Sequence, residues 1–104
     1  MTGVAAVDVQ QAHDMMEAGE AVLIDVREPG EVAEVRIPFA TVIPLSEIAD
    51  RMDEVPDDGA YIMCHAGGRS ARTVDFLERY GKHATNVDGG ISAWEAEGFP
   101  VERG

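Results

Sequence analysis

The stretch Ile62-Met63-Cys64-His65-Ala66-Gly67-Gly68-Arg69-Ser70 decides the fold, and it holds the only cysteine of the chain. Residues 60–64 form an apolar run, which predicts a central strand covered on both faces. Residues 70–80 have helical periodicity and are followed by a glycine stop signal. A strand, a tight glycine loop and a helix in this order place the cysteine at the carboxyl end of a sheet, the edge where open α/β folds bind ligands.

The rest of the chain repeats this alternation of apolar strands and helical segments, which is typical of a parallel sheet covered by helices. Further strands are predicted at residues 4–7, 21–26, 41–43 and 85–87. Four further helices are predicted: one capped by Asp8, one after Pro29, one from Ser46 through Arg51, and one opened by Gly89-Gly90. A length of 104 residues fits one α/β domain, residues 1–104, and therefore one site.

Three side-chain patterns are expected to serve packing rather than chemistry. Val74 and Leu77 share a stripe that Tyr80 would extend, and Trp94 is expected in the core. Asp25 follows an apolar run and is expected to pair with an arginine such as Arg27.

The charge balance is strongly acidic. Twenty Asp and Glu residues against eight Lys and Arg residues give a net charge of −12, which disfavours nucleic-acid and anionic membrane partners. Adaptation to high salt is an alternative to an ordinary acidic surface. One cysteine cannot form an internal disulfide, and no leader-like or membrane-spanning apolar run is found, so the cytoplasm is the expected location.

The setting of Cys64 favours reactivity over packing. A lone cysteine at a strand end is often a small buried hydrophobic residue. Here, however, Gly67 and Gly68 allow backbone N–H groups to turn toward one point, and the following helix adds the positive end of its dipole. Arg69 adds a permanent cation. These groups are expected to favour the thiolate, which is the nucleophilic form, and to hold an incoming anion.

Several segments along the chain match one known family in their order and roughly in their spacing. They are Val22-Leu23-Ile24-Asp25-Val26-Arg27-Glu28, Arg36-Ile37-Pro38, Ile43-Pro44-Leu45, the Cys64–Ser70 loop, Asn86-Val87-Asp88-Gly89-Gly90, Trp94 and Gly98-Phe99-Pro100-Val101. On these residues the sequence resembles the rhodanese-like sulfurtransferases in their single-domain form. The resemblance implies a three-layer sandwich with a parallel five-stranded sheet, and transfer of sulfane sulfur through a cysteine persulfide. It implies that Cys64 is the sulfur-accepting nucleophile and that the loop residues His65, Ala66, Gly67, Gly68, Arg69 and Ser70 bind the substrate.

One segment departs from the family pattern. Residues 35–40 read Val-Arg-Ile-Pro-Phe-Ala where the family usually has Gly-His-Ile-Pro-Gly-Ala. Phe39 is expected to be a core or rim residue and Arg36 a surface charge. The alternative is that one of the two shapes the mouth of the site.

Three functions remain open at this stage. The first is an enzyme that takes sulfur from thiosulfate or a persulfide and passes it to cyanide or a thiol, with a protein acceptor as a further option. The second is a sulfur-relay or binding module that works with a protein partner. The third is a phosphatase or arsenate reductase on the same fold. Four residues between Cys64 and Arg69, rather than five, favour sulfur over a tetrahedral oxyanion. No cofactor is expected, and the scattered His13, His65 and His83 predict no metal site.

Overall fold

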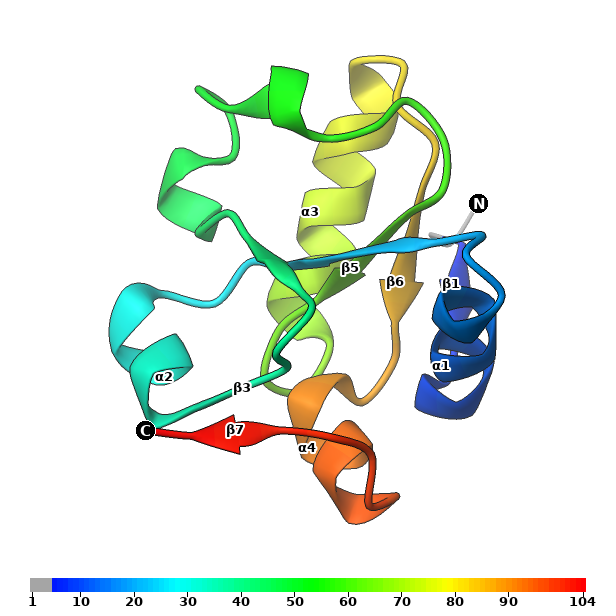
Figure 1. Cartoon of the computed structure of the whole chain (residues 1–104). Helices are drawn as coiled ribbons and strands as arrows, with labels where there is room; N and C mark the ends of the chain where they lie inside the picture. Colours follow the sequence, from blue (N-terminus) through cyan, green and yellow to red (C-terminus); the bar gives the residue numbers. More distant parts are fainter. Residues whose placement is uncertain (1–4) are drawn as a thin grey trace.

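Five short strands form a parallel sheet in the computed structural model, which describes residues 5–104 (Figure 1). Their order in the sheet is β1-β6-β5-β2-β4, and every neighbouring pair is parallel. The prediction of a five-stranded parallel sheet is therefore confirmed, although Val4 of the first predicted strand lies outside the described residues. The strands are β1 Ala6–Val7, β2 Val22–Asp25, β4 Thr41–Val42, β5 Ala60–Met63 and β6 Ala84–Val87.

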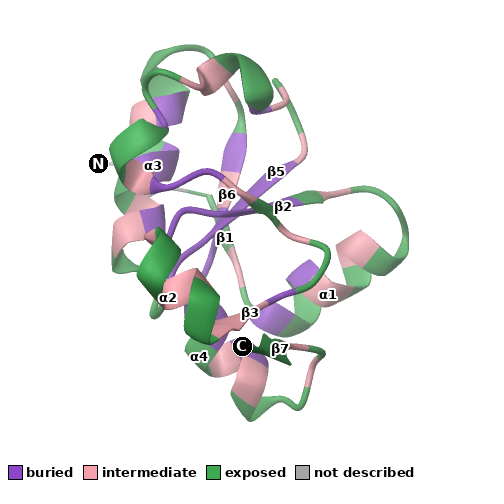
Figure 2. Cartoon of the chain, turned by 60° about the vertical axis from the view of Figure 1, so that its left-hand side comes forward, coloured by how far each residue is buried: buried purple, intermediate pink, exposed green. Residues whose placement is uncertain are grey.

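Helices cover both faces of this sheet, as the three-layer prediction requires. They are α1 Val9–Glu17, α2 Pro29–Glu34, α3 Gly68–Arg79 and α4 Gly90–Ala96. The helices α1 and α4 bury Ala12 and Trp94 in a cluster on one face, and α3 buries Val74 in a cluster on the other. Figure 2 shows the buried strands between these two layers. The predicted core position of Trp94 is confirmed, since its side chain is fully buried.

The central strand β5 determines which layer the sulfur of Cys64 joins. Successive side chains of a strand point to opposite faces of the sheet. Tyr61 and Met63 accordingly belong to the cluster under α1 and α4, whereas Ile62 belongs to the cluster under α3. Cys64, the next residue after the strand, continues this alternation into the α3 cluster. The sulfur therefore starts from a fixed face of a buried strand.

The helix predicted from Ser46 to Arg51 is wrong. The structure has two short 3₁₀ turns here, Leu45–Glu47 and Met52–Glu54. Ser46 does not cap a helix, because its hydroxyl donates to the carboxylate of Glu28 at 3.1 Å. Hydrogen bonds between residues three apart, such as Arg51 N–H to Ile48 C=O at 3.2 Å, replace the four-residue spacing of an α-helix.

Two aromatic residues lie at the surface rather than in the core. Tyr80 is exposed, and its ring lies 4.9 Å from that of Phe76, one turn earlier in the chain. The predicted stripe on α3 therefore ends at Leu77. Phe39 is also exposed, in contact with Trp94 and beside a cavity at the start of β2 that Val22 and Leu23 line. Since Cys64 follows the opposite end of the sheet, Phe39 does not line its loop.

A second, two-stranded antiparallel sheet was not predicted. β3 Val35–Arg36 pairs with β7 Glu102–Arg103 near the C-terminus. Arg36 contacts Glu102 across this pair at 3.4 Å, which gives the cation a partner at the surface. No helix within residues 5–104 has the length and apolar character that crossing a bilayer requires.

Candidate active site

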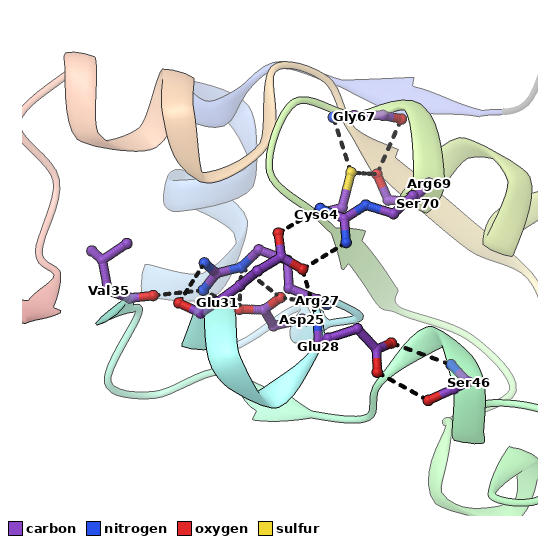
Figure 3. Close-up of polar contacts among 10 residues, drawn as sticks. All are labelled: Asp25, Arg27, Glu28, Glu31, Val35, Ser46, Cys64, Gly67, Arg69 and Ser70. Carbon is purple, nitrogen blue, oxygen red and sulfur yellow. Dashed lines mark hydrogen bonds and ion pairs between the residues drawn. The ribbon is translucent and has the colours of Figure 1, made fainter. Parts of the chain in front are cut away.

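The sulfur of Cys64 lies beneath the loop that joins β5 to α3. Cys64 is 1% exposed, and its Sγ accepts a hydrogen bond from the backbone N–H of Gly67 at 3.0 Å (Figure 3). The hydroxyl of Ser70, in the first turn of α3, lies 3.4 Å from the same atom. Donors from both the loop and the helix therefore converge on one sulfur.

These contacts favour the thiolate. Burial raises the pKa of Cys64. Hydrogen bonds from the Ser70 hydroxyl and from the backbone N–H groups of Ser70, Gly67 and Ala66 lower the pKa by more than burial raises it, so the pKa lies below its ordinary value of 9.0. The cause is that these donors interact more strongly with a charged sulfur than with a neutral one. A thiolate at this position is a nucleophile held by main-chain dipoles.

The loop geometry depends on Gly67. Its φ angle of 109° lies in the left-handed region that favours glycine, and a Cβ atom there would lie 3.2 Å from the backbone nitrogen of Gly89. This conformation turns the Gly67 N–H back toward the sulfur while its C=O accepts the first hydrogen bond of α3, from Ala71 at 3.1 Å. Sequence reasoning placed a glycine turn here, and the structure gives the reason for it.

The start of α4 holds the other side of the loop. The N–H groups of Ile91 and Ser92 donate to the carbonyl oxygens of Cys64 and His65 at 2.9 and 3.0 Å. A methyl group at Gly90 would overlap these same two oxygens. With its carbonyl groups bound to α4, the loop can present its own N–H groups to the sulfur.

A buried asparagine connects β6 to this site. The Oδ1 atom of Asn86 accepts the hydroxyl of Ser70, and its Nδ2 donates to Asp88 at 2.8 Å. The single Ser70 proton therefore has three acceptors within reach: Asn86, the carbonyl of Gly67 at 3.2 Å and the sulfur of Cys64 at 3.4 Å. The choice among them controls how strongly the sulfur is stabilised as a thiolate.

Arg69 leaves the loop toward α2. Its Nη1 and Nη2 atoms donate to the two carboxylate oxygens of Glu31 at 2.7 and 2.8 Å (Figure 3). Hydrogen bonding to Glu31 raises the pKa of Arg69, and the Cys64 thiolate contributes to this shift by a weaker charge interaction. Arg69 thus lies close enough to influence the sulfur, although its direct partner is Glu31. Arg72, one turn further along α3, is exposed.

A buried ion pair between Asp25 and Arg27 lies against α2. Asp25 and Arg27 are 0% and 1% exposed, and the carboxylate receives Nη2 of Arg27 at 2.8 Å. Arg27 also donates to the carbonyl oxygens of Glu31 at 3.3 Å and Val35 at 2.8 Å. The expected pairing of Asp25 is confirmed, and its partner positions the helix that carries Glu31.

His65 faces a surface cavity beside α2. Its side chain is exposed and lines a cavity of about 310 Å³ together with Arg27, Glu31, Glu34 and Val35. Of the remaining loop residues, Ala66 and Gly68 are exposed, and Ala66 contributes a backbone N–H toward the sulfur. The structure therefore brings Cys64, Ala66, Gly67 and Ser70 together and places Arg69 on Glu31.

Sequence reasoning did not place Glu31, Asn86 or Gly90 at the site. For Asn86 a signal existed, because a polar residue just before the end of a buried strand lies at the edge where the loop sits. Glu31 gave no comparable signal, since its contact with Arg69 spans 38 residues. In the described part of the chain, no three His, Cys, Asp or Glu side chains gather as metal ligands would.

Known proteins resemble this chain in both sequence and architecture. The profile of the rhodanese-like domain matches residues 8–97. The chain is 40% identical over 89 residues to the YtwF protein of Bacillus subtilis, covering 84% of this chain and 86% of that protein. It is 36% identical over 90 residues to a sulfurtransferase of Allochromatium vinosum, covering 84% and 83%.

Solved structures agree. A rhodanese-related protein from Thermoplasma volcanium superposes with a TM-score of 0.85 at 30% identity, covering 94% of this chain and 97% of that one. A rhodanese-like domain protein from Staphylococcus aureus gives a TM-score of 0.81 at 33% identity, covering 88% and 91%. The match extends over the strand, loop and helix that surround Cys64. From its sequence and its fold together, this chain belongs to the rhodanese-like sulfurtransferase family.

Proposed function

We propose that the protein transfers sulfane sulfur through a persulfide on Cys64. The donor is thiosulfate or a persulfide, and the acceptor is a thiol or cyanide. The observation that carries the proposal is the convergence of the Gly67 N–H and the Ser70 hydroxyl on the Cys64 sulfur, at 3.0 and 3.4 Å. A thiolate stabilised in this way is suited to attack another sulfur atom.

The first half-reaction loads the enzyme. The Cys64 thiolate attacks the outer sulfur of thiosulfate, the new sulfur–sulfur bond forms, and the bond to the sulfonate sulfur breaks with its electron pair leaving as sulfite. With a persulfide donor the same attack releases a thiolate. Charge and electron count are conserved in both cases, and no external oxidant or reductant is needed.

The second half-reaction unloads it. A thiol or cyanide attacks the terminal sulfur of the persulfide, and Cys64 leaves as the thiolate that the loop stabilises. Since the chain has a single cysteine, no internal thiol can attack the persulfide, and the acceptor must come from outside. The loop donors assist both halves, because they stabilise negative charge on the attacking sulfur and on the departing one.

Intact-mass analysis after incubation with thiosulfate tests the proposal. We expect the mass of one added sulfur atom, which cyanide or a thiol then removes. Cys64→Ser is the matched control, because it replaces one atom and should show no gain while keeping the thermal stability of the parent. A wild-type protein that gains no sulfur from thiosulfate or from a persulfide, but hydrolyses p-nitrophenyl phosphate, would overturn the proposal in favour of the phosphatase alternative.

A further inference from the structure

The Arg69–Glu31 pair joins the first turn of α3, which follows the Cys64 loop, to α2, and it has no part in the transfer steps above. Both Nη atoms of Arg69 are bound to the two carboxylate oxygens of Glu31. We propose that Glu31 is a specificity-determining residue, which binds the guanidinium of Arg69 and so withholds its charge from anionic sulfur donors. The role in donor selection rests on the proposed sulfurtransferase function, whereas the effect on charge at Cys64 does not.

The pair is held in place from several sides. A two-point contact between a guanidinium and a carboxylate restricts both groups more than a single contact does. Glu31 also accepts the backbone N–H of Glu28 at 3.1 Å, and Glu28 in turn accepts the hydroxyl of Ser46 at 3.1 Å. The hydrogen bonds from Arg69 lower the pKa of Glu31 from 4.5 to about 2, so the carboxylate stays charged at neutral pH.

The cavity beside α2 is lined by Glu31 and Glu34, and by Arg27, which is paired with Asp25. A dianion such as thiosulfate that enters this cavity meets carboxylates and a paired guanidinium group. A donor of lower charge loses less from this arrangement, because the electrostatic energy scales with the charge of the donor.

Glu31→Gln tests this directly. Glutamine keeps an oxygen that can accept the Glu28 N–H at the start of α2, but it removes the negative charge that holds Arg69. We expect KM for thiosulfate to fall about three- to tenfold, with a smaller change in kcat. The matched control is Glu54→Gln, which removes the same charge from another two-point pair, with Arg51 at 2.8 Å for both contacts. Glu54 precedes β5 whereas Cys64 follows it, so this control should leave KM at the wild-type value.

Alkylation of the single cysteine gives a readout that needs no sulfur transfer. Iodoacetate is an anion and iodoacetamide is neutral, and both react at the thiolate, so the ratio of their rates reports the charge near Cys64. We expect Glu31→Gln to raise this ratio about three- to tenfold and Glu54→Gln to leave it unchanged. If the ratio rises in a protein that transfers no sulfur, the proposed function and the role in donor selection fail, while the effect of Glu31 on the charge near Cys64 stands.

Removal of the arginine separates charge from structure. Arg69→Met alone leaves the Glu31 carboxylate uncompensated and should lower the ratio, whereas the double variant Glu31→Gln with Arg69→Met removes both charges and should return it close to the wild-type value. Equal ratios in the wild type and in Glu31→Gln would overturn the inference. A double variant that keeps the full gain of Glu31→Gln would do the same, because the gain would then not come from Arg69. A Cys64 that reacts with neither reagent also counts against it, since Arg69 would then influence no accessible sulfur.

Discussion

Two neighbouring strands of the sheet end in the same way and put the result to different uses. β5 and β6 each run into a glycine pair that begins a helix, Gly67-Gly68 for α3 and Gly89-Gly90 for α4. After β5 the N–H groups point at a sulfur, and after β6 they point at the carbonyl oxygens of the first loop. One loop therefore surrounds the sulfur, while its neighbour fixes the shape of that loop.

The largest expected effect is on the supporting loop. Gly90→Ala would place a methyl group against the carbonyl oxygens of Cys64 and His65, at a residue whose φ is +56°. We expect a loss of about 2–4 kcal/mol in the free energy of unfolding, together with loss of sulfur loading. Urea denaturation and intact mass would measure the two effects. Wild-type stability in this variant would contradict the view that the start of α4 constrains the Cys64 loop.

The next effect concerns the Ser70 hydroxyl, which lies between the sulfur of Cys64 and Asn86 of β6. Ser70→Ala removes a donor that lowers the pKa of Cys64, so the pKa should rise. The alkylation rate follows the thiolate and increases as the pH passes upward through this pKa, so its midpoint should move to higher pH. An unchanged midpoint in the iodoacetamide pH profile would show that the backbone donors act alone.

A smaller effect of opposite sign is expected at Asn86. Asn86→Ala removes the acceptor that competes with the sulfur for the Ser70 proton. The hydroxyl can then donate to Cys64, which should lower its pKa and move the alkylation midpoint to lower pH. The same pH profile measures this shift, with Ser70→Ala as the opposing reference. A midpoint that moves upward would mean that Asn86 orients Ser70 toward the sulfur rather than away from it.

The smallest effect is expected at Gly68, the counterpart of Gly90 in the first loop. Apart from its two chain neighbours and the backbone of its own helix, no described atom would lie within 4 Å of a Cβ atom at Gly68, the first residue of α3. Gly68→Ala should therefore raise the free energy of unfolding by about 0.5–1 kcal/mol, since alanine loses less backbone entropy in a helix. Urea denaturation in parallel with Gly90→Ala gives the contrast. A destabilised Gly68→Ala would indicate that the first loop is as tightly enclosed as the second.

Most of the fold could be predicted because the strands and helices near the site are set by residues close together in the sequence. The apolar run before Cys64 gave β5, and Asp8 caps α1 as expected, with Gln11 completing a reciprocal capping pair at 2.8 and 3.1 Å. The error at Ser46 has a tertiary cause, since its hydroxyl serves Glu28, 18 residues away in sequence. The β3–β7 pair was missed for a similar reason, because residues 35–36 pair with residues 102–103, which lie at the far end of the chain.

The site divides along the same line. Cys64 and the glycine loop follow from a strand, a turn and a helix in direct succession. The partners that shape their chemistry come from other elements: Glu31 from α2, Asn86 from β6 and Gly90 from α4. A single sequence does not predict which of these distant residues come into contact, because only the packed sheet brings the strand ends together.

The alternation along β5 has one more consequence. Ile62 and Cys64 lie on the α3 side of the sheet, while Tyr61 and Met63 face α1 and α4. The face that the sulfur takes therefore depends on the number of residues that precede Cys64 in the strand. Deleting or inserting one residue within β5 would turn the thiol toward Trp94 without altering a single residue of the loop. The register of residues along β5 therefore determines the position of the sulfur as much as the atoms that contact it do.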